Sequence, residues 1–109
     1  MNVLLVDDEA LLAKLMREIL VRAGWAVTIA HSLTEAKSQA GPFDLVIADV
    51  RLPNGDGRHL RSLYPKTRFI TISGFPHEEV DLQKPFTPDQ LRGKVREVMS
   101  HDADPTAPV

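Results

Sequence analysis

The 109-residue chain contains no cysteine, which excludes a disulfide framework and a thiolate metal site. Aromatic residues make up 6%, and no second aromatic next to Trp25 offers a platform for stacking nucleic-acid bases. No apolar run approaches the length of a membrane span, and the start, MNVLLVDDEA, lacks the basic leading segment of a signal peptide. With a net charge of -2 there is no bulk attraction to nucleic acid. We therefore expect a cytoplasmic protein that binds neither nucleic acid nor membrane directly.

The composition that is present, 43% hydrophobic and 26% charged, is typical of an ordinary soluble domain. We assign residues 1–100 to a single domain. The remaining segment, HDADPTAPV at 101–109, is polar and contains proline, so we expect a flexible C-terminal tail. The same residues could also begin a linker within a longer protein.

Short apolar segments alternate with helical patterns along the chain. We expect strands at 2–6, 25–30, 43–48, 68–72 and 80–83, and helices from about 9 to 23, 33 to 40, 58 to 63 and from 88 onward. Ser32 with Glu35, and Thr87 with Gln90, form the reciprocal caps that begin two of these helices. Alternation of this kind predicts an α/β fold with a parallel sheet that is covered on both faces.

Acidic residues follow two of the predicted strands at the point where each strand ends. Asp7 and Asp8 come directly after residues 2–6, and Asp49 comes directly after residues 43–48. Because the carboxyl ends of parallel strands line one edge of a sheet, we expect these carboxylates to converge. Converging carboxylates repel one another, and a hard divalent cation such as Mg²⁺ relieves that repulsion.

Ser73 and Lys84 follow the fourth and fifth predicted strands and should reach the same edge. A hydroxyl and an ammonium beside a metal–carboxylate cluster suit a phosphoryl group, because the cations neutralise its oxygens and the hydroxyl donates a hydrogen bond. Each residue also has a plainer explanation. Asp7-Asp8 could cap a helix, Asp49 and Ser73 could belong to turns, and Lys84 could be a solvated lysine.

Taken in order along the chain, these residues resemble those of a response regulator receiver domain of the CheY-like type. The residues that carry the resemblance are Asp7-Asp8 after VLLV, Asp49 in LVIADVRLP, Pro53, Gly57, Ser73-Gly74 and the KPF run at 84–86. The resemblance covers roughly residues 2–100. It implies a flavodoxin-like, doubly wound, five-stranded parallel sheet in the order 2-1-3-4-5.

The resemblance also implies a role for each residue. Asp49 would be the phosphoacceptor, taking a phosphoryl group from the phosphohistidine of a sensor histidine kinase or phosphotransfer protein. Asp8, Asp49 and the backbone carbonyl of Arg51 would hold Mg²⁺, with Asp7 acting through water. Lys84 would pair with Asp49 and then with the phosphoryl group, to which Ser73 would also turn. Pro53 and Gly57 would shape the loop after Asp49, and a cis bond would precede Pro85.

Only residues 74–79 connect the fourth and fifth predicted strands, where a receiver domain usually has a helix. The chain must return by about 15 Å along the sheet and about 5 Å sideways. Six extended residues span at most about 20 Å, whereas a helix rises only about 1.5 Å per residue. We therefore predict an extended loop in place of the helix. This shortening resembles a small subfamily of atypical single-domain receivers.

The missing helix and the residue at position 81 each lead to an expectation. Loss of the helix should uncover one face of the fourth and fifth strands, unless the loop folds over it; the candidates for exposure are Ile70, Ile72, Phe75, Val80 and Leu82. Such a patch would suit a downstream protein or a homodimer interface. Asp81 stands where most receivers carry an aromatic residue, so we also hypothesise that phosphorylation orders the 74–80 loop instead.

Three functions remain to be weighed. The first is a phosphoacceptor that changes protein–protein contacts and turns over no external substrate; with no DNA-binding segment after the domain, we expect no direct transcriptional output. The second is a pseudo-receiver that no longer needs phosphate, against which the retained acids, Ser73 and Lys84 argue. The third is a Mg²⁺-dependent aspartyl-phosphate phosphatase. Such enzymes carry Asp-x-Asp after one strand, whereas here Asp7 and Asp8 are adjacent and Asp49 follows another strand, which argues against this function.

Overall fold

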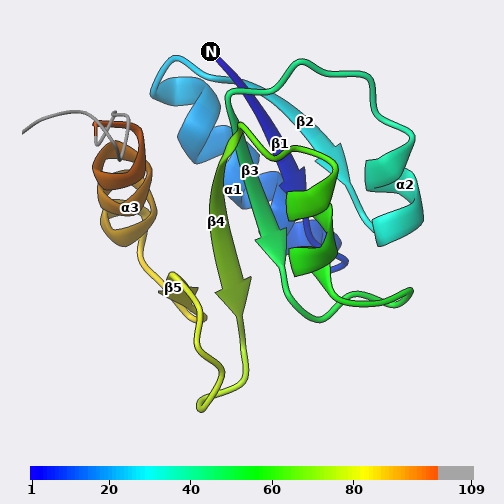
Figure 1. The fold of residues 1–109 in the computed structure, drawn as a ribbon. Coiled ribbons are helices and arrows are strands. Elements are labelled where there is room, and N and C mark those ends of the chain that lie inside the picture. Colours follow the sequence, from blue (N-terminus) through cyan, green and yellow to red (C-terminus); the bar gives the residue numbers. More distant parts are fainter. Residues whose placement is uncertain (101–109) are drawn as a thin grey trace, which may run out of the picture.

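The computed structural model describes residues 1–100, and the expected tail at 101–109 lies outside the described residues. Five parallel strands form one sheet in the order β2-β1-β3-β4-β5 (Figure 1). The strands are β1 (Asn2–Val6), β2 (Ala26–Ala30), β3 (Leu45–Asp49), β4 (Arg68–Ser73) and β5 (Leu82–Gln83). The predicted flavodoxin-like sheet and its strand order are confirmed. Within residues 1–100, no helix combines the length and apolar character that a membrane crossing requires.

Two helices cover each face of the sheet (Figure 1). They are α1 (Ala10–Arg22), α2 (Leu33–Lys37), the 3₁₀ helix η1 (Gly57–Ser62) and α3 (Pro88–Ser100). We expected α2 to reach about residue 40, but it ends at Lys37. The hydroxyl of Ser38 and Nε2 of the Gln39 side chain both donate to the carbonyl of Glu35, at 2.8 and 3.2 Å, and so satisfy a carbonyl that a further helical turn would use.

The helix ends follow the predicted capping residues. Ser32 Oγ accepts from the amide of Glu35 at 3.1 Å. Thr87 and Gln90 cap α3 reciprocally, at 2.8 and 3.1 Å. After α1, Gly24 adopts a positive φ of 99°, and its amide donates to Val21 at 3.0 Å. The amide of Trp25 donates to Leu20 at 3.0 Å, which completes a Schellman motif.

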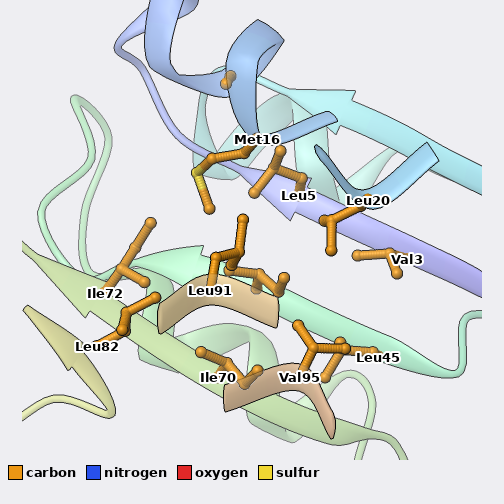
Figure 2. Close-up of a cluster of buried hydrophobic side chains, with 12 residues drawn as sticks. Val3, Leu5, Met16, Leu20, Leu45, Ile70, Ile72, Leu82, Leu91 and Val95 are labelled. Carbon is orange, nitrogen blue, oxygen red and sulfur yellow. The ribbon is translucent and has the colours of Figure 1, made fainter. Parts of the chain in front are cut away.

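Apolar side chains pack on both faces of the sheet. On one face, side chains from β1, β3 and β4 meet Met16 and Leu20 of α1 and Leu91 and Val95 of α3 (Figure 2). On the other face, β1 and β3 pack against α2 and η1 through residues such as Leu33 and Leu60. All of β3 is buried, both its apolar residues 45–48 and Asp49 at its end, as a strand of a sheet covered on both faces should be. These two layers hold the strand ends in place.

The connection between β4 and β5 contains no helix, as predicted (Figure 1). The expected exposure of the strands is wrong for Ile70, Ile72 and Leu82, which are buried; Val80 is half-buried and Phe75 is 52% exposed. Successive side chains of a strand point to opposite faces, and Ile70 and Ile72 point toward α3. Phe69 and Thr71 point to the opposite face, and Phe69 packs there against the cluster formed with α2 and η1. The predicted homodimer surface therefore loses most of its apolar basis.

Candidate functional site

The carboxyl ends of β1, β3, β4 and β5 bring four polar side chains to one edge of the sheet. Asp7 and Ser73 are fully buried, and Asp49 is 5% exposed. Lys84 Nζ lies 2.7 Å from Asp49 Oδ2 and 3.0 Å from Asp7 Oδ2. The predicted convergence of Asp7, Asp49 and Lys84 is therefore present in the structure.

Three carboxylates can meet at one point beside this lysine. One ligand oxygen each from Asp7, Asp8 and Asp49 lies within 4.8 Å of the other two, with Asp8 exposed to solvent. Asp7 Oδ1 accepts from the amide of Glu9 at 2.9 Å. Asp7 Oδ2 is close to Lys84 but has no aligned hydrogen bond within residues 1–100. A buried carboxylate oxygen without such a partner is unusual, and this donor set fits a hard divalent cation.

Burial and charge act in opposite directions on these groups. Burial raises the pKa of Asp7, and the amide of Glu9 and the ammonium of Lys84 offset only part of that rise. Burial alone would lower the pKa of Lys84, but hydrogen bonds and charge from Asp49 and Asp7 outweigh it and raise the pKa. Lys84 therefore stays protonated and holds the acids together.

The loop after β3 is fixed by two close backbone contacts. The amide of Arg51 donates to Asp49 Oδ1 at 2.8 Å. Gly57 passes so close to β3 that a Cβ atom there would lie 2.1 Å from the carbonyl oxygen of Asp49. Between them, Leu52 and Gly55 pair across a turn that contains Pro53, and Gly55 has a φ of 142°. Gly57 therefore has the loop-shaping role that was predicted for it.

Ser73 reaches the site, but its hydroxyl is engaged by its own loop. Ser73 Oγ accepts from the amide of Phe75 at 3.0 Å, and no hydrogen bond joins it to Asp49 in the described part of the chain. The carbonyl of Ser73 accepts from the amide of Lys84 at 2.7 Å and from Gln83 Nε2 at 2.9 Å. The Lys84–Pro85 bond is cis, as expected.

Asp81, in the place of the usual aromatic residue, binds the neighbouring strand. Its Oδ2 accepts from the amide and the hydroxyl of Thr71, at 2.8 and 3.0 Å. The amide of Asp81 donates to the carbonyl of Thr71 at 3.1 Å. A carboxylate thus takes a strand N–H where a longer β5 would supply a backbone carbonyl, which explains why β5 is shorter than predicted.

Sequence reasoning missed three contributors. Glu9 Oε1 lies 3.2 Å from Lys84 Nζ and adds a third acid around the lysine; its position directly after Asp7-Asp8 was the available signal. Gln83 Nε2 binds the carbonyls of Ser73 and Phe75. The side chain of Arg51 contacts the 74–81 loop, although only its backbone was considered. No sequence pattern indicates the last two, because they depend on the path of that loop.

Comparison with known proteins bears directly on this arrangement. The chain matches the family model of the response regulator receiver domain over residues 3–96. It belongs to that family. Among solved structures, the receiver domain is similar to a CheY-like receiver domain protein of Methanospirillum hungatei, with a TM-score of 0.82 and 26% identity over 91% of this chain and 93% of that one. It is also similar to response regulator TrrA of Thermotoga maritima in complex with Mg²⁺-BeF, with a TM-score of 0.78 and 27% identity over 89% and 97%.

Curated relatives of the receiver domain are longer proteins. It is 28% identical to the probable transcriptional regulator ycf29 of Porphyra purpurea, over 94% of this chain and 58% of that protein. It is 34% identical to transcription factor SKN7 of Candida albicans, over 83% of this chain and 19% of that protein. The receiver domain therefore spans little more than half of the first relative and a fifth of the second.

Proposed function

We propose that Asp49 accepts a phosphoryl group from the phosphohistidine of a sensor histidine kinase or a phosphotransfer protein. The observation that supports this most strongly is the pairing of the Asp49 carboxylate with Lys84 at 2.7 Å, inside a cluster whose acids lie within 4.8 Å of one another. A nucleophilic carboxylate, a fixed ammonium and a cation-ready acid cluster are the parts that phosphoryl transfer needs.

In the proposed step, a carboxylate oxygen of Asp49 attacks phosphorus. The new O–P bond forms as the P–N bond of the phosphohistidine breaks, and its electron pair passes to the imidazole nitrogen. Lys84 moves from the carboxylate to a phosphoryl oxygen, and the hydroxyl of Ser73 donates a hydrogen bond to another phosphoryl oxygen. Asp8, Asp49 and the backbone carbonyl of Arg51 would hold Mg²⁺, with Asp7 acting through water. When bound, that cation would neutralise charge on the phosphoryl oxygens.

The acyl phosphate would act as a signal. We propose that it changes contacts with a downstream protein, and that the domain hydrolyses its own acyl phosphate without turning over an external substrate. The Mg²⁺-BeF complex of the Thermotoga relative supports a divalent cation at such a site. The receiver domain dimer known for NtrC4, at a TM-score of 0.79 and 26% identity over 94% of this chain, supports self-association as one output.

Intact-mass analysis after incubation with acetyl phosphate and Mg²⁺ tests the proposal. The wild type should gain one phosphoryl group, and chelation of the metal should prevent the gain. Asp49→Asn should gain none, whereas the matched control Asp89→Asn, at an exposed acid of α3, should behave as the wild type. Equal labelling of Asp49→Asn and wild type would refute the assignment.

A further inference from the structure

We propose that the side chain of Arg51 is a positioning element that couples the phosphoacceptor loop to the loop presenting Ser73. This inference rests on the proposed function for the roles of Asp49 and Ser73. It concerns a side chain that the proposed phosphoryl transfer does not use, since only the backbone of Arg51 was assigned a part in holding the cation.

Arg51 contacts the 74–81 loop in two ways. Its guanidinium carbon lies 4.0 Å from the centroid of the Phe75 ring. Its Nε donates to Glu78 Oε1 at 3.0 Å. Each contact is modest at a partly exposed site, but both act on the same short segment. The guanidinium therefore fixes the middle of the loop against the loop that follows β3.

The other end of the same residue contacts the acceptor. The amide of Arg51 donates to Asp49 Oδ1 at 2.8 Å. A phosphoryl group on Asp49 changes the charge and geometry that this amide meets, so a shift of the Arg51 backbone is transmitted to the guanidinium. One residue thus joins the carboxylate to the loop.

The loop contacts in turn orient the Ser73 hydroxyl. The amide of Phe75, whose ring stacks on Arg51, donates to Ser73 Oγ at 3.0 Å. A hydroxyl has one proton to donate and can accept twice, so this bond leaves the proton of Ser73 free. Gln83 Nε2 ties the carbonyls of Phe75 and Ser73 together, at 2.8 and 2.9 Å. The loop holds Ser73 ready to donate.

The absence of the helix explains why such a device is needed. A helix satisfies its own backbone groups, whereas this extended connection must find partners elsewhere. The amide of Glu78 donates to the carbonyl of Phe75 at 3.2 Å, and the two side chains meet Arg51. Through these contacts Arg51 holds the loop in a position that a helix would otherwise maintain by its own hydrogen bonds and packing.

The contacts of Arg51 with Phe75 and Glu78 form what we call the Arg51 clamp. Amide exchange measured by NMR on the unphosphorylated protein tests this clamp independently of phosphoryl transfer. Arg51→Met should speed exchange at Phe75 and Glu78 by about fivefold or more, because the stack and the ion pair are both lost. Glu78→Gln should give a smaller increase. The controls Arg17→Met and Glu79→Gln remove exposed charges outside the clamp and should leave both rates within about twofold. Unchanged rates in Arg51→Met would overturn the inference.

A second measurement tests the coupling itself. With Mg²⁺ and beryllofluoride, the amide resonances near Asp49, Lys84 and Glu78 should all move in the wild type. In Arg51→Met, those near Asp49 and Lys84 should still move and that of Glu78 should stay. Identical Glu78 shifts in both proteins would overturn the coupling. Absence of any shift near Asp49 in the wild type would instead count against the proposed function.

Discussion

At the scale of single residues, the site is organised around one ammonium. Lys84 Nζ lies within 3.2 Å of carboxylate oxygens from Asp7, Glu9 and Asp49. Two of these acids are buried, where an unpaired charge is costly. The third, Glu9, is largely exposed. The lysine therefore offsets the repulsion of the acids, and a divalent cation would add to that effect rather than replace it.

Magnesium should stabilise the folded protein through Asp8. Any ligand bound only by the folded state raises the free energy of unfolding, by about 1.4 kcal/mol at ten times its Kd. Asp8→Asn removes an exposed carboxylate from the cluster and should abolish most of this gain. Urea unfolding with and without Mg²⁺ measures it. Glu18→Gln, on the exposed side of α1, is the matched control and should keep the wild-type gain.

Asp81→Ala should destabilise the fold. Thr71 is 4% exposed, and the substitution leaves its amide without the carboxylate that now accepts from it. The loss should be about 1–3 kcal/mol. Urea unfolding checks it, with Glu79→Ala expected to change stability by no more than about 0.5 kcal/mol. Equal losses in the two variants would mean that the Thr71–Asp81 bonds contribute nothing.

At the scale of elements, the loop after β3 and the loop after β4 do most to shape the site. The first is held by the close passage of Gly57 beside Asp49. The second replaces a helix and depends on Arg51, Gln83 and Asp81 for its polar contacts. The helices act at a distance, by fixing the strands from which these loops leave.

Two glycine substitutions should change the stability of the fold in opposite directions. A Cβ at Gly57 would meet the carbonyl oxygen of Asp49 at 2.1 Å, so Gly57→Ala forces the backbone to shift and should cost about 1–3 kcal/mol. A Cβ at Gly93, inside α3, meets nothing within 4 Å, so Gly93→Ala should stabilise by about 0.5–1 kcal/mol through helix propensity. Thermal unfolding measures both, and destabilisation by both would contradict this view of the two positions.

The start of η1 should show a pH signature. Asp56 Oδ1 accepts from the amide of Arg58, and the Arg58 side chain lowers the pKa of Asp56. A carboxyl group whose pKa is lower in the folded than in the unfolded protein adds to stability at any pH above its unfolded pKa. This contribution is lost as the pH falls through the folded pKa. Asp56→Asn keeps the cap but loses the charge, so it should cost about 0.5–1 kcal/mol at pH 7. The free energies of unfolding of the two proteins should converge as the pH falls below about 4 and through the lowered pKa of Asp56. A difference that stays constant with pH would contradict a role for the Asp56 charge.

The sequence predicted the regular elements and the site residues at their ends better than it predicted the contacts of the loops. The helix caps and the meeting of Asp7, Asp49 and Lys84 follow from local patterns and from the geometry of parallel sheets, whereas the strand order came from the resemblance to receiver domains. The exposure of Ile70 and Ile72 was predicted wrongly because the alternation of β4 was not applied to the two faces separately. The Asp81 and Arg51 contacts depend on how a loop without regular structure returns along the sheet, which no local pattern specifies.

At the scale of the whole molecule, two apolar layers support one polar edge. Side chains of β1, β3 and β4 contribute to both layers, one of which is drawn in Figure 2. The polar groups of the site gather where these strands and β5 end. The receiver domain thus has a closely packed body and, beside the site, a surface in which the usual helix is replaced by a loop. We expect signalling to be read from that surface.

Locating the phosphoryl group tests the central claim most directly. Borohydride reduces an aspartyl phosphate to homoserine, so reduction after incubation with acetyl phosphate and Mg²⁺, followed by peptide mass mapping, identifies the acceptor. We predict homoserine at Asp49, in the peptide that contains LVIADVR. Homoserine at Asp7 or Asp8, or at no aspartate, would contradict it.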